Sequence, residues 1–156
     1  MKVEITVNGR ARTIDAAPNL LLVQAIRENL KLTGTHVGCD TAQCGACTVI
    51  MNGNAVKSCN VLLAQAQGAQ VTTIEGLADA DGTMHPMQSA FKDCHGLQCG
   101  YCTPGFLMSS FALLAENQNP SEAEVRRALN GHLCRCTGYS QIVESVLKAA
   151  GTLRGN

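Results

Sequence analysis

The chain has 156 residues and carries twelve basic side chains (Lys and Arg) against twelve acidic ones (Asp and Glu), so its formal net charge is zero. Proteins that bind nucleic acid or an anionic membrane surface normally show an excess or a run of positive charge, and the balanced composition therefore argues against both kinds of partner. Hydrophobic residues make up 46% of the chain, which is enough for the core of one compact domain or of two small ones.

The first half of the chain shows strand patterns around one helical segment. Apolar and polar side chains alternate over residues 3–7, and Asn8-Gly9 is a typical hairpin turn after such a strand. Apolar residues after Pro18 recur with helical spacing, and Gly34 follows as a stop signal. We expect strands at residues 3–7, 12–14, 48–51, 55–59 and 71–74, and a helix over residues 21–30.

The second half is helical in pattern and follows a polar, glycine-containing stretch over residues 75–83. Thr103-Pro104 is typical of a helix start, with Thr103 as the N-cap. Ser121 and Glu124 form a capping-box pattern ahead of another apolar stripe. We expect helices at residues 84–91, from 103 onward, from 121 to a stop at 130–131, and from 142 to a stop at 151. The chain is therefore predicted to be α+β, with one domain over residues 1–76 and a helical domain over residues 77–156.

The beginning of the sequence also bears on the compartment. It lacks the continuous apolar stretch of a secretory signal, and no apolar run is long enough to span a bilayer. We therefore expect a cytoplasmic protein without membrane insertion. In a reducing compartment, nine cysteines indicate metal binding or catalysis and disfavour disulfides.

Four cysteines of the first half have the spacing of a plant-type 2Fe–2S site. They follow the pattern C-x4-C-x2-C, with a fourth thiol after eleven intervening residues. Three thiolates from one loop can surround a compact iron–sulfur core, and one from an adjacent strand completes the ligand set. Gly38, Gly45 and Ala46 are small enough to let backbone N–H groups approach the sulfur atoms. The expected ligands are Cys39, Cys44, Cys47 and Cys59.

A second set of four cysteines lies in the helical half, as C-x2-C, thirty-one residues, then C-x-C. The first pair directly precedes a predicted helix, whose positive N-terminal end favours an anionic cluster. The second pair lies between two predicted helices, where Arg135 can offset negative charge. The expected ligands are Cys99, Cys102, Cys134 and Cys136.

Structural zinc is the alternative for either set, because paired cysteines also build zinc ribbons and zinc fingers. The spacing of the first set favours iron–sulfur, whereas the permissive C-x-C pair leaves the second set open between the two metals. Cys94 is the ninth thiol, and we expect it to be a small packing residue rather than a ligand. Histidine can replace cysteine in Rieske-type centres, but eight thiols are already available. We therefore expect the four histidines, His36, His85, His95 and His132, to be loop or surface residues.

Taken in order, these motifs resemble those of one protein family. They are G-C-D-T-A-Q-C-G-A-C-T-V, V-K-S-C, T-T-I-E-G-L, G-L-Q-C-G-Y-C-T-P-G and L-C-R-C-T-G-Y. The family is the iron–sulfur (small) subunit of molybdenum hydroxylases, the xanthine dehydrogenase family. The resemblance extends to the small subunit of aerobic carbon monoxide dehydrogenase and to relatives that act on N-heterocycles. It covers residue 1 to about residue 150, and all eight cysteines of the family pattern are present.

The resemblance implies a β-grasp, plant-ferredoxin-like N-terminal domain followed by a four-helix bundle, each with one 2Fe–2S cluster. It implies that electrons come from a molybdenum–pterin site on a large partner subunit. They would then pass through the C-terminal and the N-terminal cluster to FAD on a medium subunit, or to an external acceptor. It further implies that Gln98 approaches the pterin, that Cys136 lies on the molybdenum-facing side, and that the complex is a dimer of heterotrimers. No residue of this chain would be catalytic.

Two other functions are open from the residues alone. A freestanding ferredoxin-like carrier would need only the first domain, so the helical half argues against it. A zinc-stabilised interaction module would follow if both sets held zinc. The substrate of a complex would be chosen on another polypeptide.

Overall fold

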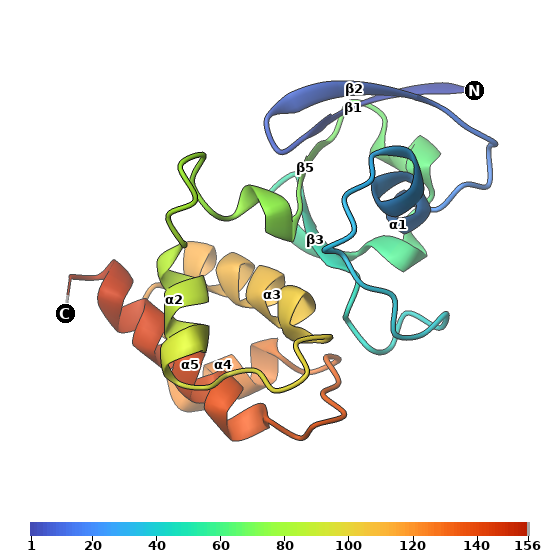
Figure 1. The fold of residues 1–156 in the computed structure, drawn as a ribbon. Coiled ribbons are helices and arrows are strands. Elements are labelled where there is room, and N and C mark those ends of the chain that lie inside the picture. The colour runs from blue at the N-terminus through green and yellow to red at the C-terminus, as the bar shows by residue number, and fades with distance from the viewer. Residues whose placement is uncertain (156) are drawn as a thin grey trace.

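The computed structural model describes residues 1–155, which form a sheet-containing lobe and a helical lobe (Figure 1). The strands are β1 (Lys2–Val7), β2 (Arg10–Asp15), β3 (Thr48–Met51), β4 (Asn54–Lys57) and β5 (Gln70–Thr72). They form one mixed sheet in the order β2-β1-β5-β3-β4, in which β1 and β5 are parallel and the other neighbours antiparallel. The α+β class predicted from the sequence is confirmed.

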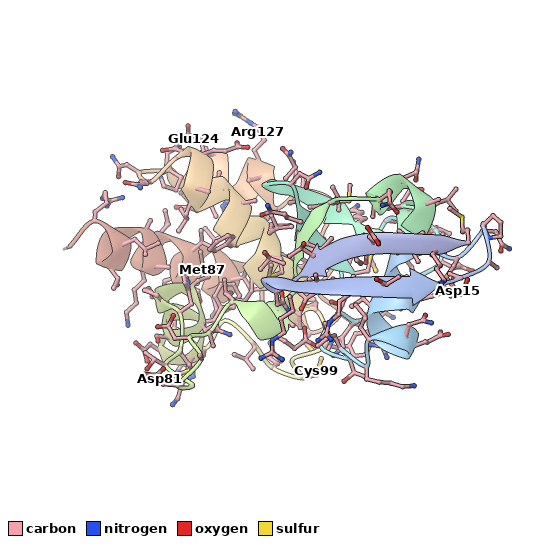
Figure 2. The ribbon with its side chains drawn as sticks, turned by 90° about the horizontal axis from the view of Figure 1, so that it is seen from above. Asp15, Asp81, Met87, Cys99, Glu124 and Arg127 are labelled. Carbon is pink, nitrogen blue, oxygen red and sulfur yellow. The ribbon has the colours of Figure 1, made fainter. Side chains whose placement is uncertain are left out.

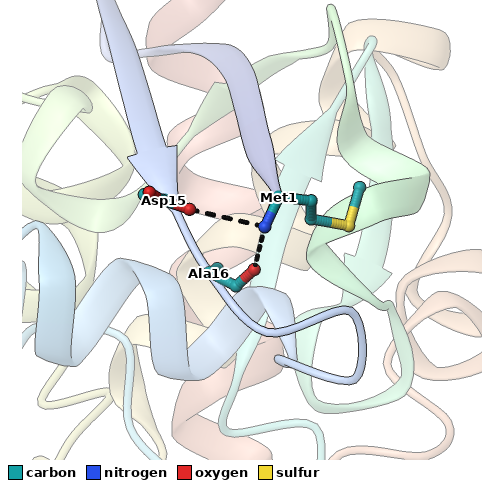
Figure 3. Close-up of polar contacts among 3 residues, drawn as sticks. All are labelled: Met1, Asp15 and Ala16. Carbon is teal, nitrogen blue, oxygen red and sulfur yellow. Dashed lines mark hydrogen bonds and ion pairs between the residues drawn. The ribbon is translucent and has the colours of Figure 1, made fainter.

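Both predicted hairpin turns are present. Asn8 and Gly9 have φ of 49° and 74°, and Asn52 and Gly53 have φ of 50° and 85°. Two successive residues with positive φ are what a tight two-residue hairpin requires, and Asn-Gly meets this at low steric cost. Where the first hairpin opens, the ammonium group of Met1 donates hydrogen bonds to the carbonyl oxygen of Ala16 at 2.7 Å and to Asp15 Oδ1 at 3.4 Å (Figure 3).

The expected helix over residues 21–30 is present as α1 (Leu22–Gln24) followed by a π-helical turn over Ala25–Asn29. Leu22 and Ile26 are fully buried on it and pack in one cluster with the inward side chains of β1, β3 and β5. The sheet lobe therefore has its own core, built from aliphatic residues.

Strand β2 begins two residues earlier than expected, and two other strands end earlier than expected. The return strand β4 stops at Lys57, and Cys59 lies in a 3-10 turn over Ser58–Asn60. Strand β5 stops at Thr72, and Ile74 begins a second 3-10 turn that ends at Gly76. β-branched and apolar residues at these positions resemble strand residues, but the chain turns there to leave the sheet.

The helical lobe consists of α2 (Pro86–Asp93), α3 (Thr103–Glu116), α4 (Glu122–Ala128) and α5 (Tyr139–Leu153), as predicted for a four-helix domain. The capping box of α4 is confirmed, with Ser121 N donating to Glu124 Oε2 at 2.7 Å. Several helix ends differ from the prediction: α2 begins and ends two residues later, α4 ends at Ala128, and α5 begins at Tyr139. Thr103 is the first residue of α3 and Cys102 is its N-cap, while α5 runs through Gly151 to Leu153. A side chain at Gly151 would meet open space, so this glycine sits on an exposed face without ending the helix.

The two lobes pack where α3 meets β3, and Ile50 of β3 belongs to the core of the helical lobe (Figure 1). Gly105 in the first turn of α3 allows this contact, because a Cβ atom there would lie 2.2 Å from the carbonyl oxygen of Gly45. Seen from above, the β1–β2 hairpin lies at one end of the molecule and helices α2 to α5 at the other, with Cys99 between them (Figure 2). Among residues 1–155, no helix has both the length and the apolar character needed to cross a bilayer.

Candidate metal centres

The first cysteine set lies on the loop that enters β3 and on the turn that follows β4. Cys47 is buried, and the other three are half-buried. Ser58 ties the two segments together, because its backbone N–H and its hydroxyl both donate to the Cys47 carbonyl oxygen, at 3.3 and 2.6 Å. This contact holds Cys59, the next residue, beside Cys47.

Within this set the thiols approach each other in two pairs. The backbone N–H of Cys44 donates to Cys39 Sγ at 3.4 Å, and N–H groups of Cys44 and Thr41, with the Cys44 thiol, lower the pKa of Cys39 to about 6. Burial and then the adjacent Cys47 thiol raise the pKa of Cys59 to about 11. The backbone donors thus favour the thiolate form of Cys39, whereas Cys59 would lose its proton on binding a metal cation.

The second set also forms two pairs, from loops far apart in the sequence. Cys99 is exposed, and the backbone N–H of Tyr101 and then the Cys136 side chain lower its pKa. Cys102 occupies the N-cap position of α3 and lies against Cys134, and burial followed by this neighbour raises its pKa to about 12. Gly138 N donates to Cys134 Sγ at 3.4 Å, so a backbone donor also faces a sulfur here.

Both cysteine sets open onto one cavity of about 460 Å³. Cys44 of the first set lines it together with Cys99, Cys102 and Cys134 of the second, and Arg135 and Tyr101 complete part of the wall. Gly38 also belongs to this wall, where a Cβ atom would come within 3.2 Å of Cys44 Sγ. The two sets are therefore neighbours in space.

The donors present fit a 2Fe–2S cluster at each set. Such a cluster takes two ligands on each of its irons, and the structure presents two pairs of thiols in each lobe, with backbone N–H groups directed at Cys39 and Cys134. A tetrahedral zinc site needs all four ligands around one ion. Within residues 1–155, no three or more Cys, His, Asp or Glu side chains are grouped to hold a single ion.

Comparison with known proteins agrees with this geometry. Residues 5–78 match the family model of the 2Fe-2S iron-sulfur cluster binding domain, and residues 73–147 match that of the 2Fe-2S binding domain. The chain is 48% identical to the nicotine 6-hydroxylase small subunit of Paenarthrobacter nicotinovorans, over 98% of this chain and 92% of the relative. It is 42% identical to the nicotinate dehydrogenase small FeS subunit of Eubacterium barkeri, over 92% and 91%.

The chain belongs to the small iron–sulfur subunits of molybdenum hydroxylases. Among solved structures, quinoline 2-oxidoreductase from Pseudomonas putida 86 matches this iron–sulfur subunit with a TM-score of 0.93 and 40% identity, over 99% of this chain and 97% of that chain. Aldehyde oxidoreductase from Desulfovibrio gigas matches with a TM-score of 0.94 and 41% identity, over 99% of this chain but 17% of that longer chain. The subunit is thus an electron-transfer component of an oxidoreductase complex with larger partners.

Backbone and side-chain contacts hold the two cysteine loops of the iron–sulfur subunit together. Tyr101 stacks on His36 with ring centroids 4.6 Å apart, and its hydroxyl donates to the Val37 carbonyl oxygen at 2.7 Å. His36 Nδ1 lies 2.7 Å from the Tyr101 carbonyl oxygen, and since a carbonyl only accepts, this nitrogen carries the hydrogen. Leu133 N donates to the Cys44 carbonyl oxygen at 3.0 Å. Residue patterns in the sequence offered no signal for these cross-lobe contacts.

The remaining site residues take distinct positions. Gln98 is exposed, and its Nε2 donates to the Cys136 carbonyl oxygen at 3.0 Å, so it lies at the second cysteine set. Arg135 lines the cavity, where its positive charge can offset the negative charge of a bound cluster. Cys94 ends α2, outside both sets.

The histidines lie in loops or at a helix end, as expected, and besides His36 two more have specific contacts. His85 caps α2 by accepting from Met87 N at 3.1 Å. His132 packs between the lobes, and burial, then the nearby Lys57, lowers its pKa to about 4.

Proposed function

We propose that the iron–sulfur subunit holds one cluster at Cys39, Cys44, Cys47 and Cys59 and the other at Cys99, Cys102, Cys134 and Cys136. The shared cavity carries this proposal, because Cys44 of the first set lines it together with three thiols of the second. In this arrangement the two cluster sites adjoin, so an electron that enters the helical lobe can pass directly to the sheet lobe. When bound, a 2Fe–2S cluster accepts and releases one electron.

The chain itself contributes ligands, shielding and hydrogen bonds. N–H groups of Cys44 and Gly138 donate to sulfur atoms and so stabilise negative charge on them. Cys47 and Cys134 are buried, which limits the access of water and of external acceptors to one side of each set. These hydrogen bonds and this burial tune the reduction potential of each cluster and the side on which an electron leaves it. The residues perform no bond chemistry on a substrate.

The second set is the side that we propose faces the molybdenum–pterin subunit. Cys99 is the exposed member of that set, and large apolar side chains remain exposed around it. They are Val37, Leu97, Tyr101, Leu133 and Tyr139. Exposed apolar groups that gather at one edge of a monomer mark a surface that a partner covers. Gln98, on the same loop as Cys99, would then approach the pterin.

The finer organisation follows what the resemblance to the family implies. We propose a medium FAD subunit on the side of the first cysteine set, a dimer of heterotrimers, a cytoplasmic location, and a domain boundary between residues 76 and 77. The 3-10 turn Ile74–Gly76 and the separate core of each lobe support this boundary. Sizing of the purified complex by light scattering tests the stoichiometry.

Metal analysis with ligand variants tests the cluster assignment. We expect about four irons and about four acid-labile sulfides per chain and two paramagnetic signals after reduction, because each cluster contributes two irons and one unpaired electron. Cys59→Ser is expected to remove one signal, and Cys136→Ser the other. Stoichiometric zinc without colour, or loss of both signals in each variant, would contradict the assignment.

A paired substitution tests the docking side. Leu133→Glu places a charge on the exposed edge near Cys99, whereas Leu153→Glu places the same charge at the far end of α5. We expect Leu133→Glu to release the large subunit during co-purification and Leu153→Glu to retain it. If the chain purifies with full iron content but never with a larger partner, the freestanding carrier is the better description.

A further inference from the structure

His132 connects three segments that each carry thiols of the two cysteine sets. It lies two residues before Cys134, in the loop of the second set. Its Nε2 lies 2.7 Å from Ser109 Oγ of α3, the helix that Cys102 caps, and 3.1 Å from Thr48 Oγ1, which directly follows Cys47. One ring nitrogen thus contacts side chains of both lobes.

The hydrogen-bond directions at this point are determined by Thr48. Its hydroxyl donates to the Gly45 carbonyl oxygen at 2.7 Å. Because a hydroxyl has a single hydrogen, Thr48 can only accept from His132. His132 Nε2 therefore carries the hydrogen and shares it between the two hydroxyl oxygens, while the buried Nδ1 has no hydrogen-bond partner among residues 1–155.

Packing around the ring leaves little freedom. A Cβ atom at Gly45, where φ is +73°, would lie 2.5 Å from His132 Cδ2. Phe106 of α3 packs on the ring with centroids 5.3 Å apart. The next residue, Leu133, donates its N–H to the Cys44 carbonyl oxygen. The imidazole is wedged between the loop of one set and the helix of the other.

We propose that His132 is a positioning residue that sets the distance and relative orientation of the two cluster sites. This inference rests on the proposed cluster ligands and adds a residue that contributes no ligand of its own. The magnetic interaction between two reduced clusters depends on their separation and orientation, so it reports directly on such a role, independently of turnover.

The test compares His132→Leu with His132→Gln in the assembled complex. Gln can place an N–H donor near the two hydroxyls, whereas Leu fills the space without one. We expect both variants to keep about four irons per chain, which checks the ligand assignment separately. At low temperature, the magnetic interaction between the two reduced clusters splits their paramagnetic signals. We expect this splitting to change in His132→Leu and to remain as in the unsubstituted protein in His132→Gln. His95→Asn, an exposed histidine with φ of 54° that Asn tolerates, is the control and should change nothing.

A second variant covers the case in which His132→Leu fails to assemble. Ser109→Ala removes one acceptor of the shared hydrogen and alters neither cysteine loop. We expect a smaller change of the splitting in the same direction. Unchanged splitting in an iron-replete His132→Leu, or in Ser109→Ala if His132→Leu does not assemble, would overturn the proposal.

Discussion

The ammonium group of Lys57 donates hydrogen bonds to the carbonyl oxygen of Ala42 at 2.8 Å and to that of Gln43 at 3.3 Å. Lys57 ends β4, while Ala42 lies at the tip of the first cysteine loop with φ of 57°. A non-glycine residue in the left-handed region is held there at a cost of about 1 kcal/mol or more. Lys57 therefore holds the loop that carries Cys39 and Cys44 in its observed form.

Lys57→Met should weaken retention of the N-terminal cluster. The variant loses a charged hydrogen bond of about 1.5–3 kcal/mol but keeps the length of the side chain. We expect iron to fall from about four to about two per chain during incubation with a chelator, at a higher rate than in the unsubstituted subunit. Lys92→Met, an exposed lysine in the last turn of α2, is the matched control. Equal rates in the two variants would show that the loop needs no such support.

Gly45→Ala should disrupt the contact between the lobes. The backbone at Gly45 has φ of +73°, and a Cβ atom would lie 2.5 Å from the His132 ring and 2.9 Å from the Gly131 carbonyl oxygen. Gly53→Ala is the matched control, because Gly53 has φ of +85° and open space around it. Gly53→Ala has only the backbone strain, which costs about 1 kcal/mol. We expect Gly45→Ala to lose clearly more stability in thermal unfolding. Similar losses in both variants would mean that the steric contact is unimportant.

Cys94→Ala should leave both clusters intact. Cys94 ends α2 and has no place in either cysteine set, so its thiol is available neither as a ligand nor as a replacement. We expect an unchanged iron content and two unchanged paramagnetic signals, whereas Cys47→Ala should lose about half the iron. A loss of iron in Cys94→Ala would require a revised ligand set.

The lowered pKa of His85 predicts that the stability of the fold depends on pH. Burial lowers the pKa of His85 below the ordinary value of 6.5, with Asp79 acting in the opposite direction. The unfolded chain thus takes up a proton at a higher pH than the folded chain, so stability is full above about pH 6.5 and falls as the pH drops toward the folded pKa. Protonation also removes the Nδ1 acceptor that caps α2.

His85→Asn should reduce this pH dependence, because Asn caps helices without titrating. Thermal unfolding of the cluster-loaded chain between about pH 5.5 and pH 7.5 measures the slope, a range that brackets the ordinary His pKa. We expect a flatter profile in His85→Asn and the original slope in the exposed-site variant His95→Asn. An unchanged slope in His85→Asn would assign the effect to another group.

Short-range sequence patterns determined much of this protein's secondary structure and the identity of its cysteine sets. The cysteine spacings are evident from the sequence, as are the Asn-Gly hairpin turns and the Ser121–Glu124 capping box, because each depends on residues a few positions apart. Strand ends were less certain. The patterns extended β4 to Cys59 and β5 to Ile74, whereas both residues lie in 3-10 turns, since the point where a strand leaves a sheet depends on what its neighbours pair with.

Only the tertiary structure brought distant segments together. It placed Cys99 beside Cys136 and Cys102 beside Cys134, and it set Cys44 on the same cavity as the second set. The positions of Tyr101 and His132 between the two cysteine loops likewise follow from how α3 packs on β3, and Lys57 reaches the first loop from the end of β4. Contacts of this kind are decided by the docking of whole elements, in which shape and burial act over long sequence separations, and no short motif records them.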